Sequence, residues 1–516
     1  MSSQMLSRAA VLALLAAAGG VVTIGGCAVG PNYVPPTAET PASYSTPLGG
    51  GEKSGQVDLK LWWKNLGDPA LDQLMQQAVA QNLDLRASAA RIAQARAFRG
   101  VVNASFFPTV DASAGFERAR TSANGNGAFG GNSLTTNNYL GGFDVGWEID
   151  VFGRVARGVE SADADIGVAV ENQRFVLVSL MAEVARNYVE YRSFQRRLVF
   201  AKQNADSQRD SLKLVEVRFN AGIVSELDVA RAKALLATTE SSIPSLDEAR
   251  IAAANRLAVL LGQSPGTLEQ VLAGDGTLAA SANTVPVGLP SELLRRRPDI
   301  RSAERSIASA NAQIGVATAD LFPRFSLTGS FGLASGTAGN FFEGSSRFWS
   351  FGPAVKWNVF DAGRINANIA VQEARTYEAL VRYQQSVLSA LEEVENSLVG
   401  YQREQTRRDS LATAVEANQR AVNLATELNT RGLTDYLSVL DAQRALFLTQ
   451  DQLAESEGAV LTNLVALYKA LGGGWEELPV PVTPQRKIDE APSWWPSGQQ
   501  AEKTPPAEAA AAKPVG

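Results

Sequence analysis

The chain has 516 residues, with 47 basic and 53 acidic side chains, a net charge of −6 and no histidine. An acidic chain without a basic stripe is a poor partner for nucleic acid. The lack of histidine removes the commonest general base and the commonest zinc ligand, and no Walker A or HExxH string occurs. We therefore expect no catalytic residue, no metal, no cofactor and no nucleic acid partner.

The N-terminus has the features of an export signal. An apolar stretch from Ala9 to Ile24 follows Arg8 and ends in two glycines before Cys27. This stretch is too short and too interrupted by glycine for a permanent spanning helix, so residues 1–26 are predicted to be a lipoprotein signal peptide. The only cysteine, Cys27, stands where a lipobox places the lipidated first residue. The alternative is a plain secreted protein with a free thiol.

Two segments near the ends have the composition of chain that does not fold by itself. Residues 27–65 are rich in Pro, Gly and Ser and are predicted to be a lipid-anchored tether, in which Trp62 and Trp63 act as packing anchors. Residues 476–516 are rich in Pro, Ala and Glu. They cannot bury enough apolar area to offset the entropy of ordering, which predicts a disordered tail.

Between these segments the sequence repeats itself. Residues 82–110 align with residues 297–325 at a shift of 215, and Trp147–Arg154 aligns with Trp357–Arg364 at a shift of 210. The change of register predicts a shorter loop between the matched strands of the second copy. We predict two structural repeats, at 66–265 and 285–475, each made of a helix, two strands and a long helical hairpin.

The four predicted strands alternate apolar and polar residues. In the strand predicted from Tyr139 to Phe152, the polar face carries Asp144, Glu148 and Asp150. Strands of about ten residues with this alternation are typical of outer-membrane barrels, in which the polar face lines the lumen. The smallest such barrels need eight strands, so four strands must be pooled across subunits, and three chains supply twelve. For the strands alone, a soluble antiparallel sheet is the alternative.

Two proline-free segments, residues 154–221 and 364–431, predict helices of about 100 Å with coiled-coil spacing. The chain reverses at a glycine after each helix, which gives two helical hairpins. The predicted hairpin tips comprise Gly222, Ile223, Val224, Gly432, Leu433 and Thr434. Helices that start directly from membrane-type strands predict a conduit. A lipid-anchored coiled-coil scaffold without a pore is the alternative.

Four segments carry a family likeness: GPNYVPP after Cys27, LPSELLRRRPDIRSAE at Leu289–Glu304, the following IGVATADLFP, and YLSVLDAQRALF at Tyr436–Phe447. They resemble the TolC-like outer membrane factors, in particular the NodT-type lipoprotein branch that serves RND multidrug efflux systems. The resemblance covers residues 27 to 475. It implies an internally duplicated α+β membrane protein, a homotrimeric twelve-stranded outer-membrane β-barrel continuous with a long periplasmic α-helical coiled-coil barrel.

The family also implies a function and partners. The chain is expected to be the passive outer-membrane exit duct of a tripartite efflux pump for small toxic compounds or drugs. A periplasmic adaptor (membrane fusion) protein is expected to dock at the hairpin tips, and an inner-membrane RND transporter to supply the energy. The protein is expected in the cell outer membrane, in contact with its lipid and anchored by lipid, and extending into the periplasm. A type I secretion exit duct, which shares the fold, is the alternative.

The YLSVLDAQRALF segment is expected to contain the periplasmic gate. Leu437, Asp441 and Arg444 are spaced at i, i+4 and i+7, which places them on one helix face. In the family, the matching positions line the closed end of the tunnel, where leucines constrict it and the charged pair links neighbouring helices. Without the resemblance, Asp441 and Arg444 are better interpreted as an ordinary solvated i,i+3 pair.

One departure from the family pattern concerns this gate. Family members commonly carry Arg-Tyr four and three residues before the hairpin glycine. The first copy here has Arg218 and Phe219, whereas the second has Leu428 and Asn429. The contribution of that pair to the gate is therefore in doubt in the second hairpin.

The lipid anchor is tested by Cys27→Ser. Because the acyl chain is attached through the thiol, this variant should lose fatty-acid incorporation and signal processing at this position. Metabolic labelling with a fatty-acid analogue measures both outcomes against the parent. Equal labelling of parent and variant would reject the lipobox.

Overall fold

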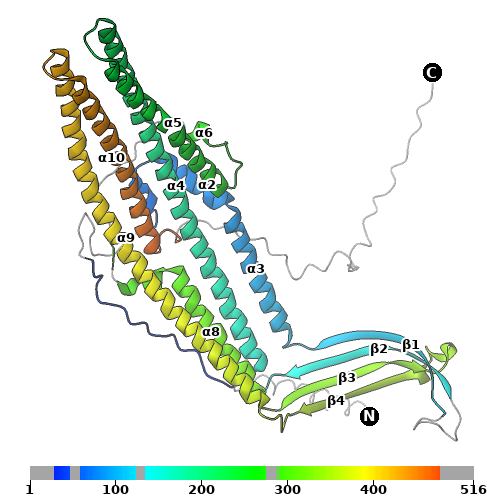
Figure 1. The fold of residues 1–516 in the computed structure, drawn as a ribbon. Coiled ribbons are helices and arrows are strands. Elements are labelled where there is room, and N and C mark those ends of the chain that lie inside the picture. The colour runs from blue at the N-terminus through cyan, green and yellow to red at the C-terminus, as the bar shows by residue number, and fades with distance from the viewer. Residues whose placement is uncertain are drawn as a thin grey trace, which may run out of the picture.

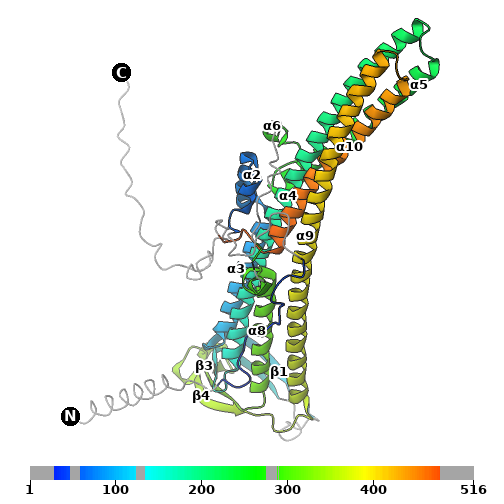
Figure 2. The ribbon, with the colours of Figure 1, turned by 90° about the vertical axis from the view of Figure 1, so that its left-hand side faces the viewer.

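The computed structural model describes residues 28–46, 59–123, 134–272, 274, 287–288 and 290–476. The predicted signal peptide, the predicted lipidation site Cys27 and the tail beyond Glu476 lie outside these residues. A tall body of helices carries a four-stranded sheet that projects from one end (Figure 1). Two long helical hairpins form the opposite end of the molecule (Figure 2).

Among the described residues, the first half of the chain contains a short 3-10 helix, two strands and five α-helices. They are η2 (Trp62–Leu66), α2 (Pro69–Gln81), α3 (Leu83–Ala104), β1 (Thr109–Arg120), β2 (Thr135–Ile149), α4 (Arg154–Asn220), α5 (Glu226–Leu260) and α6 (Glu269–Leu272). The second half contains η3 (Pro290–Glu292), α7 (Leu293–Arg296), α8 (Pro298–Ala319), β3 (Arg324–Ser335), η4 (Ala338–Asn340), η5 (Gly344–Ser346), β4 (Arg347–Lys356), α9 (Arg364–Thr430) and α10 (Tyr436–Ala470).

Most matching elements of the two halves have equal lengths, whereas β2 and β4 differ, with 15 and 10 residues. Helices α3 and α8 have 22 residues each, α4 and α9 have 67 each, and α5 and α10 have 35 each. Strands β1 and β3 have 12 each. The two halves therefore present the same order of helix, strands and hairpin, and the long helices begin and end within one residue of the predicted bounds.

Strand β2 differs from the sequence prediction at both ends, because it runs from Thr135 to Ile149 and not from Tyr139 to Phe152. Just past the strand, the Asp150 carboxylate accepts a hydrogen bond from the backbone N–H of Ala156 at 2.8 Å. The alternating pattern continues past the end of the ladder, but the chain must already turn to place a cap at the start of α4.

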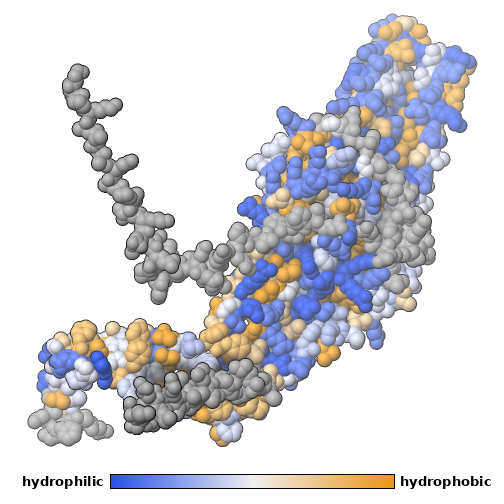
Figure 3. Space-filling view, turned by 180° about the vertical axis from the view of Figure 1, so that it is seen from behind, coloured by the Kyte–Doolittle hydropathy of each residue, from blue (hydrophilic) through white to orange (hydrophobic). Residues whose placement is uncertain are grey.

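The sheet is antiparallel in the order β1-β2-β3-β4 and its register is unbroken. Paired residues lie on the same face, so the apolar residues of neighbouring strands line up on one face of the sheet and the polar residues on the other. One row of paired positions holds Ala112, Phe143, Phe331 and Trp349, and the adjacent row on the other face holds Asp111, Asp144, Ser330 and Ser350. We refer to these as the apolar face and the polar face. In Figure 3, hydrophobic residues gather over the sheet and hydrophilic residues over the helices.

The main hydrophobic core lies at the middle of the helical body, where α2, α4, α8, α9 and α10 meet η2. Trp62 and Trp63, expected as packing anchors, are 2% and 1% exposed. The Trp62 ring stacks on Tyr468 of α10 with the centroids 4.9 Å apart. A smaller cluster near the hairpin tips joins Val215 and Val229 of the first hairpin to residues of the second. The two hairpins are thus packed together at both levels.

Residues 28–46 follow the outside of the helices, and Figure 1 shows them as the dark blue trace beside α8 and α9. The buried Arg157 of α4 donates hydrogen bonds to the carbonyls of Val29 and Gly30 at 3.1 and 3.2 Å. Farther along, the Thr46 hydroxyl donates to Glu395 of α9 at 2.6 Å. This part of the predicted tether therefore has a defined path from the sheet toward the middle of the body.

The RRPDI segment has a structural role. Arg297 is 5% exposed, and its guanidinium forms two hydrogen bonds with the Asp299 carboxylate at 3.0 and 2.6 Å. It also donates to Glu393 of α9 at 2.6 Å and to the carbonyl of Ala470, the last residue of α10, at 2.9 Å. One buried cation therefore ties the start of α8 to two other helices, and it satisfies a carbonyl at a helix end that has no partner within its own helix.

Replacing this cation should destabilise the body. We expect Arg297→Ala to lower the free energy of unfolding by about 3 kcal/mol, because it leaves two carboxylates and a carbonyl without their shared donor. Urea unfolding of the detergent-solubilised protein measures the change. The exposed neighbour Arg295 supplies the control, since Arg295→Ala should stay within about 0.5 kcal/mol of the parent. Equal effects of the two variants would show that the buried network contributes little.

Candidate functional site

The features that bear on function are spread along the molecule: the hairpin tips, one face of α10 and the polar face of the sheet. Among the described residues there is no group of His, Cys, Asp or Glu side chains able to hold a metal ion. None of the helices within the described ranges has the length and apolarity needed to cross a membrane.

The two hairpin tips have the same backbone geometry. Gly222 and Gly432 adopt φ values of +73° and +74°, in the left-handed region that favours glycine. The N–H of Ile223 donates to the carbonyl of Arg218 at 2.9 Å, and the N–H of Leu433 donates to that of Leu428 at 2.9 Å. These are Schellman caps, which satisfy the last carbonyls of α4 and α9 and turn the chain sharply.

Each returning helix starts at a side-chain cap. Ser225 and Asp228 form a reciprocal capping box at the start of α5. At the start of α10, the Asp435 carboxylate accepts hydrogen bonds from the Ser438 hydroxyl at 2.8 Å and from its N–H at 3.2 Å. These bonds stabilise the ionised form and hold the pKa of Asp435 below its usual range. Both tips are therefore rigidly specified by local sequence.

Each tip exposes one large apolar side chain. Ile223 and Leu433 are 71% and 70% exposed, at the end of the molecule farthest from the sheet (Figure 2). Val224 is half-buried against the small tip cluster, and Thr434 is half-buried as well. The tips therefore combine a fixed backbone with unpartnered apolar side chains, which is a suitable surface for another protein.

The predicted gate residues form an exposed stripe on α10. Leu437 is 37% exposed, and Asp441 and Arg444 are both exposed. Within the described part of the chain, neither charged side chain has a hydrogen-bond or ion-pair partner. The ordinary i,i+3 ion pair, which was the alternative interpretation, is not formed. The stripe is free to contact a neighbouring helix outside this chain.

Asn429 connects the two hairpins, a role that the sequence did not reveal. The Arg218 guanidinium donates to the Asn429 side-chain oxygen at 2.8 Å, and the Asn429 amide donates to the carbonyl of Thr434 at 3.1 Å. Arg218, which keeps the family pattern in the first copy, is therefore bonded to Asn429, one of the two residues by which the second copy departs from it. No local pattern relates positions 218 and 429, so only the packing of the two hairpins could reveal the link.

The three carboxylates predicted for the lumen have different surroundings. Asp144 is exposed on the polar face and is paired in register with Asp111. Glu148, also in β2, accepts two hydrogen bonds from Arg154 of α4 at 2.9 and 2.8 Å. Asp150 lies beyond the strand and caps α4, as described above. Two of the three thus hold the junction between sheet and helix.

Comparison with known proteins identifies the family. The family model for outer membrane efflux proteins matches residues 74–263 and again residues 289–473. Nodulation protein T of Rhizobium leguminosarum bv. trifolii is 34% identical over 452 residues, which are 88% of this chain and 95% of that protein. The solvent efflux pump outer membrane protein SrpC of Pseudomonas putida is 34% identical over 464 residues, covering 88% and 97%.

A solved structure agrees with these relatives. The outer-membrane channel OprN superposes with a TM-score of 0.80 at 38% identity, covering 87% of this chain and all of that one. The chain belongs to the outer membrane efflux protein family, which confirms the resemblance seen in the sequence. It is an efflux protein of the outer membrane that extends into the periplasm, and the family is one of transporters and not of enzymes.

Proposed function

We propose that three copies of this chain form a continuous duct, a twelve-stranded barrel in the outer membrane joined to a barrel of helices in the periplasm. The observation that carries this proposal is the sheet with its two faces and two free edges. Within the described residues, β1 and β4 each pair on one side only. Backbone groups in lipid must be satisfied, so these edges require partners. Edge pairing between three copies closes the sheet and buries no polar face in lipid.

The proposed duct assigns a place to each segment. The apolar face of the sheet contacts lipid, and the polar face, with Asp144 and Glu148, lines the lumen. The two repeats, at 66–265 and 285–475, supply equivalent parts of the wall. After removal of residues 1–26, Cys27 carries the lipid anchor and residues 27–65 connect it to the body. Residues 476–516 follow the second repeat as the predicted disordered tail.

The duct is passive in this proposal, and its energy comes from an inner-membrane RND transporter through a periplasmic adaptor. Several relatives are named as outer membrane proteins of efflux pumps for solvents or toluene, which supports small toxic compounds or drugs as the cargo. Planar-bilayer recording tests the duct itself. Purified protein should give discrete conductance steps, and protein that is folded and inserted but does not conduct would favour the scaffold.

The gate is tested by removing both charges of the α10 stripe. We expect Asp441→Ala combined with Arg444→Ala to raise bilayer conductance and vancomycin sensitivity without loss of the trimer. Each partly desolvated link between neighbouring helices is worth about 1 to 3 kcal/mol, and symmetry multiplies the loss. Asp210→Ala combined with Lys213→Ala is the control, because that exposed i,i+3 pair is bonded within its own helix at 3.0 Å. Parent-like conductance of the test variant would place the gate elsewhere.

Adaptor docking is tested at the exposed tip. Leu433→Glu places a charge where an apolar contact is expected, so efflux and crosslinking to the adaptor should both fall by at least about tenfold. Trimer yield and conductance should remain at the parental level, since the side chain has no packing role within the chain. Leu424→Glu, at a 52% exposed leucine of α9 about 14 Å along the helix from the tip, is the matched control. Normal crosslinking of Leu433→Glu would argue against docking at the tips.

A further inference from the structure

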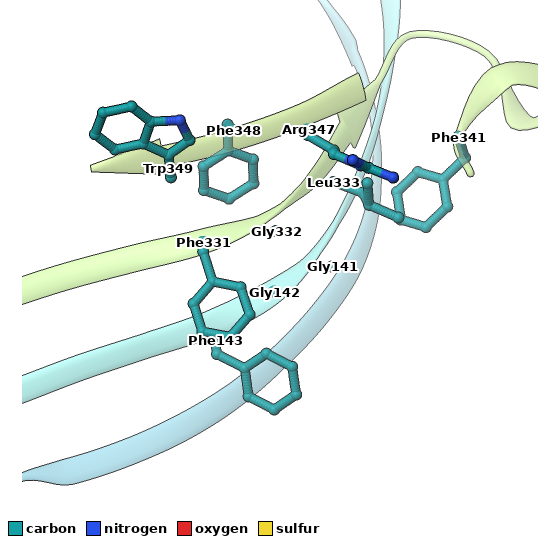
Figure 4. Close-up of a pocket in the computed structure, with 10 residues that line it drawn as sticks. All are labelled: Gly141, Gly142, Phe143, Phe331, Gly332, Leu333, Phe341, Arg347, Phe348 and Trp349. Carbon is teal, nitrogen blue, oxygen red and sulfur yellow. The ribbon is translucent and has the colours of Figure 1, made fainter. Parts of the chain in front are cut away.

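A cavity of about 530 Å³ opens on the sheet at the end remote from the helices. Figure 4 shows Arg347, Leu333 and Phe341 gathered at one side of it, with Phe331 and Phe143 at the other. The remaining lining residues are Gly141, Gly142, Gly332, Phe348 and Trp349. The wall is therefore almost entirely apolar, with one cationic side chain at its margin.

The register fixes where this cavity lies. Arg347 is the first residue of β4, and the last residue of that strand, Lys356, leads toward α9. Arg347 pairs with Leu333, which in turn pairs with Gly141, so the row that they form is at the far end of the sheet. Because the helices extend into the periplasm, this end faces the outside of the cell. The cavity therefore lies at the level of the outer leaflet.

Most of the lining belongs to the apolar face. Phe143 stacks on Phe331 with the ring centroids 5.1 Å apart, and the paired Trp349 is 73% exposed. Gly141 has no side chain, and a Cβ placed there would lie 3.3 Å from the Phe341 ring. This absence of a side chain leaves the floor of the cavity open beneath an aromatic wall.

The charge on the apolar face has a single sign. Its charged residues within the four strands are Arg118, Arg120 and Arg347, all toward the same far end, whereas the carboxylates of the strands lie on the polar face. Arg347 has no hydrogen-bond or ion-pair partner in the described part of the chain. If β1 of a second copy paired with β4 of this chain, its side chains on the apolar face would include Arg118 and Arg120 but no carboxylate. The strand residues of this face thus offer Arg347 no carboxylate, and an anion paired with it is expected to come from outside the sheet.

We propose that this cavity binds a phosphate-bearing lipid of the outer leaflet, with the phosphate on the Arg347 guanidinium and an acyl chain between Phe331, Leu333 and Trp349. A guanidinium forms paired, charge-assisted hydrogen bonds with phosphate. The apolar wall suits an acyl chain. Free phosphate would contact only Arg347 and would leave this wall without a partner. The inference rests on the proposed placement of the apolar face in lipid.

Native mass spectrometry of the detergent-solubilised protein tests this site with two lipids of equal chain length, dipalmitoyl phosphatidic acid and dipalmitoylglycerol. The parent should bind the phosphatidic acid about tenfold more tightly, as expected for hydrogen bonds to a charged group. Arg347→Ala should remove this preference and keep the binding of dipalmitoylglycerol. The control Arg118→Ala, an exposed arginine of the same face that does not line the cavity, should retain the preference.

A second variant tests the cavity independently of the charge. Leu333→Trp fills the space between the aromatic walls and should weaken the binding of both lipids by a similar factor. The proposal is overturned if Arg347→Ala and Arg118→Ala behave alike, if the two lipids bind parent equally, or if inorganic phosphate alone displaces phosphatidic acid. Conductance separates a failure of the lipid site from a failure of the proposed duct. A protein that conducts but does not prefer phosphatidic acid would reject only the lipid site.

Discussion

The backbone hydrogen bonds at the edges of the sheet are the constraint on which the remaining structure depends. A strand edge exposed to lipid leaves a row of N–H and C=O groups without partners, and each costs several kcal/mol. In the proposed trimer, the four strands, with edges at β1 and β4, satisfy this requirement by joining other copies. The helices would then share the same symmetry, because β2 and β4 lead within a few residues into α4 and α9. The strand-to-helix junctions are accordingly held by specific bonds, such as those of Glu148 to Arg154.

The helical body combines a firm middle with weakly joined ends. Trp62, Trp63 and their neighbours fill a large core at the level of η2, where Arg297 also binds three segments of chain. Toward the tips the apolar cluster is small, and the hairpins are linked by polar contacts such as that of Arg218 with Asn429. Polar links in an exposed region are readily exchanged with water or with another protein. This gradient suits a duct that is fixed in the membrane and has a mobile entrance.

In the proposed barrel, the two faces of the sheet meet different surroundings. The carboxylates of the strands lie on the polar face, and the charged residues of the apolar face are all arginines, toward its outer end. A lumen tolerates acidic groups because water solvates them, whereas a surface against lipid accepts charge only near headgroups. The cavity beside Arg347 follows the same rule, since its cation lies at the margin and its aromatic wall continues toward the middle of the sheet.

The sequence alone determined the elements that depend on local pattern. Alternation predicted the strands, absence of proline and heptad spacing predicted the 67-residue helices, and the glycines at 222 and 432 predicted the turns, because each signal acts over a few neighbouring residues. The family, and with it the outer-membrane location, also followed from sequence motifs. Cys27, the gate and the docking tips stay predictions. The tertiary structure decided what depends on distant contacts: the Arg218–Asn429 link, the bonds of Arg297 to Glu393 and Ala470 and the position of Arg347 beside a cavity. These features join positions that no periodicity relates, so the packing of whole elements had to bring them together.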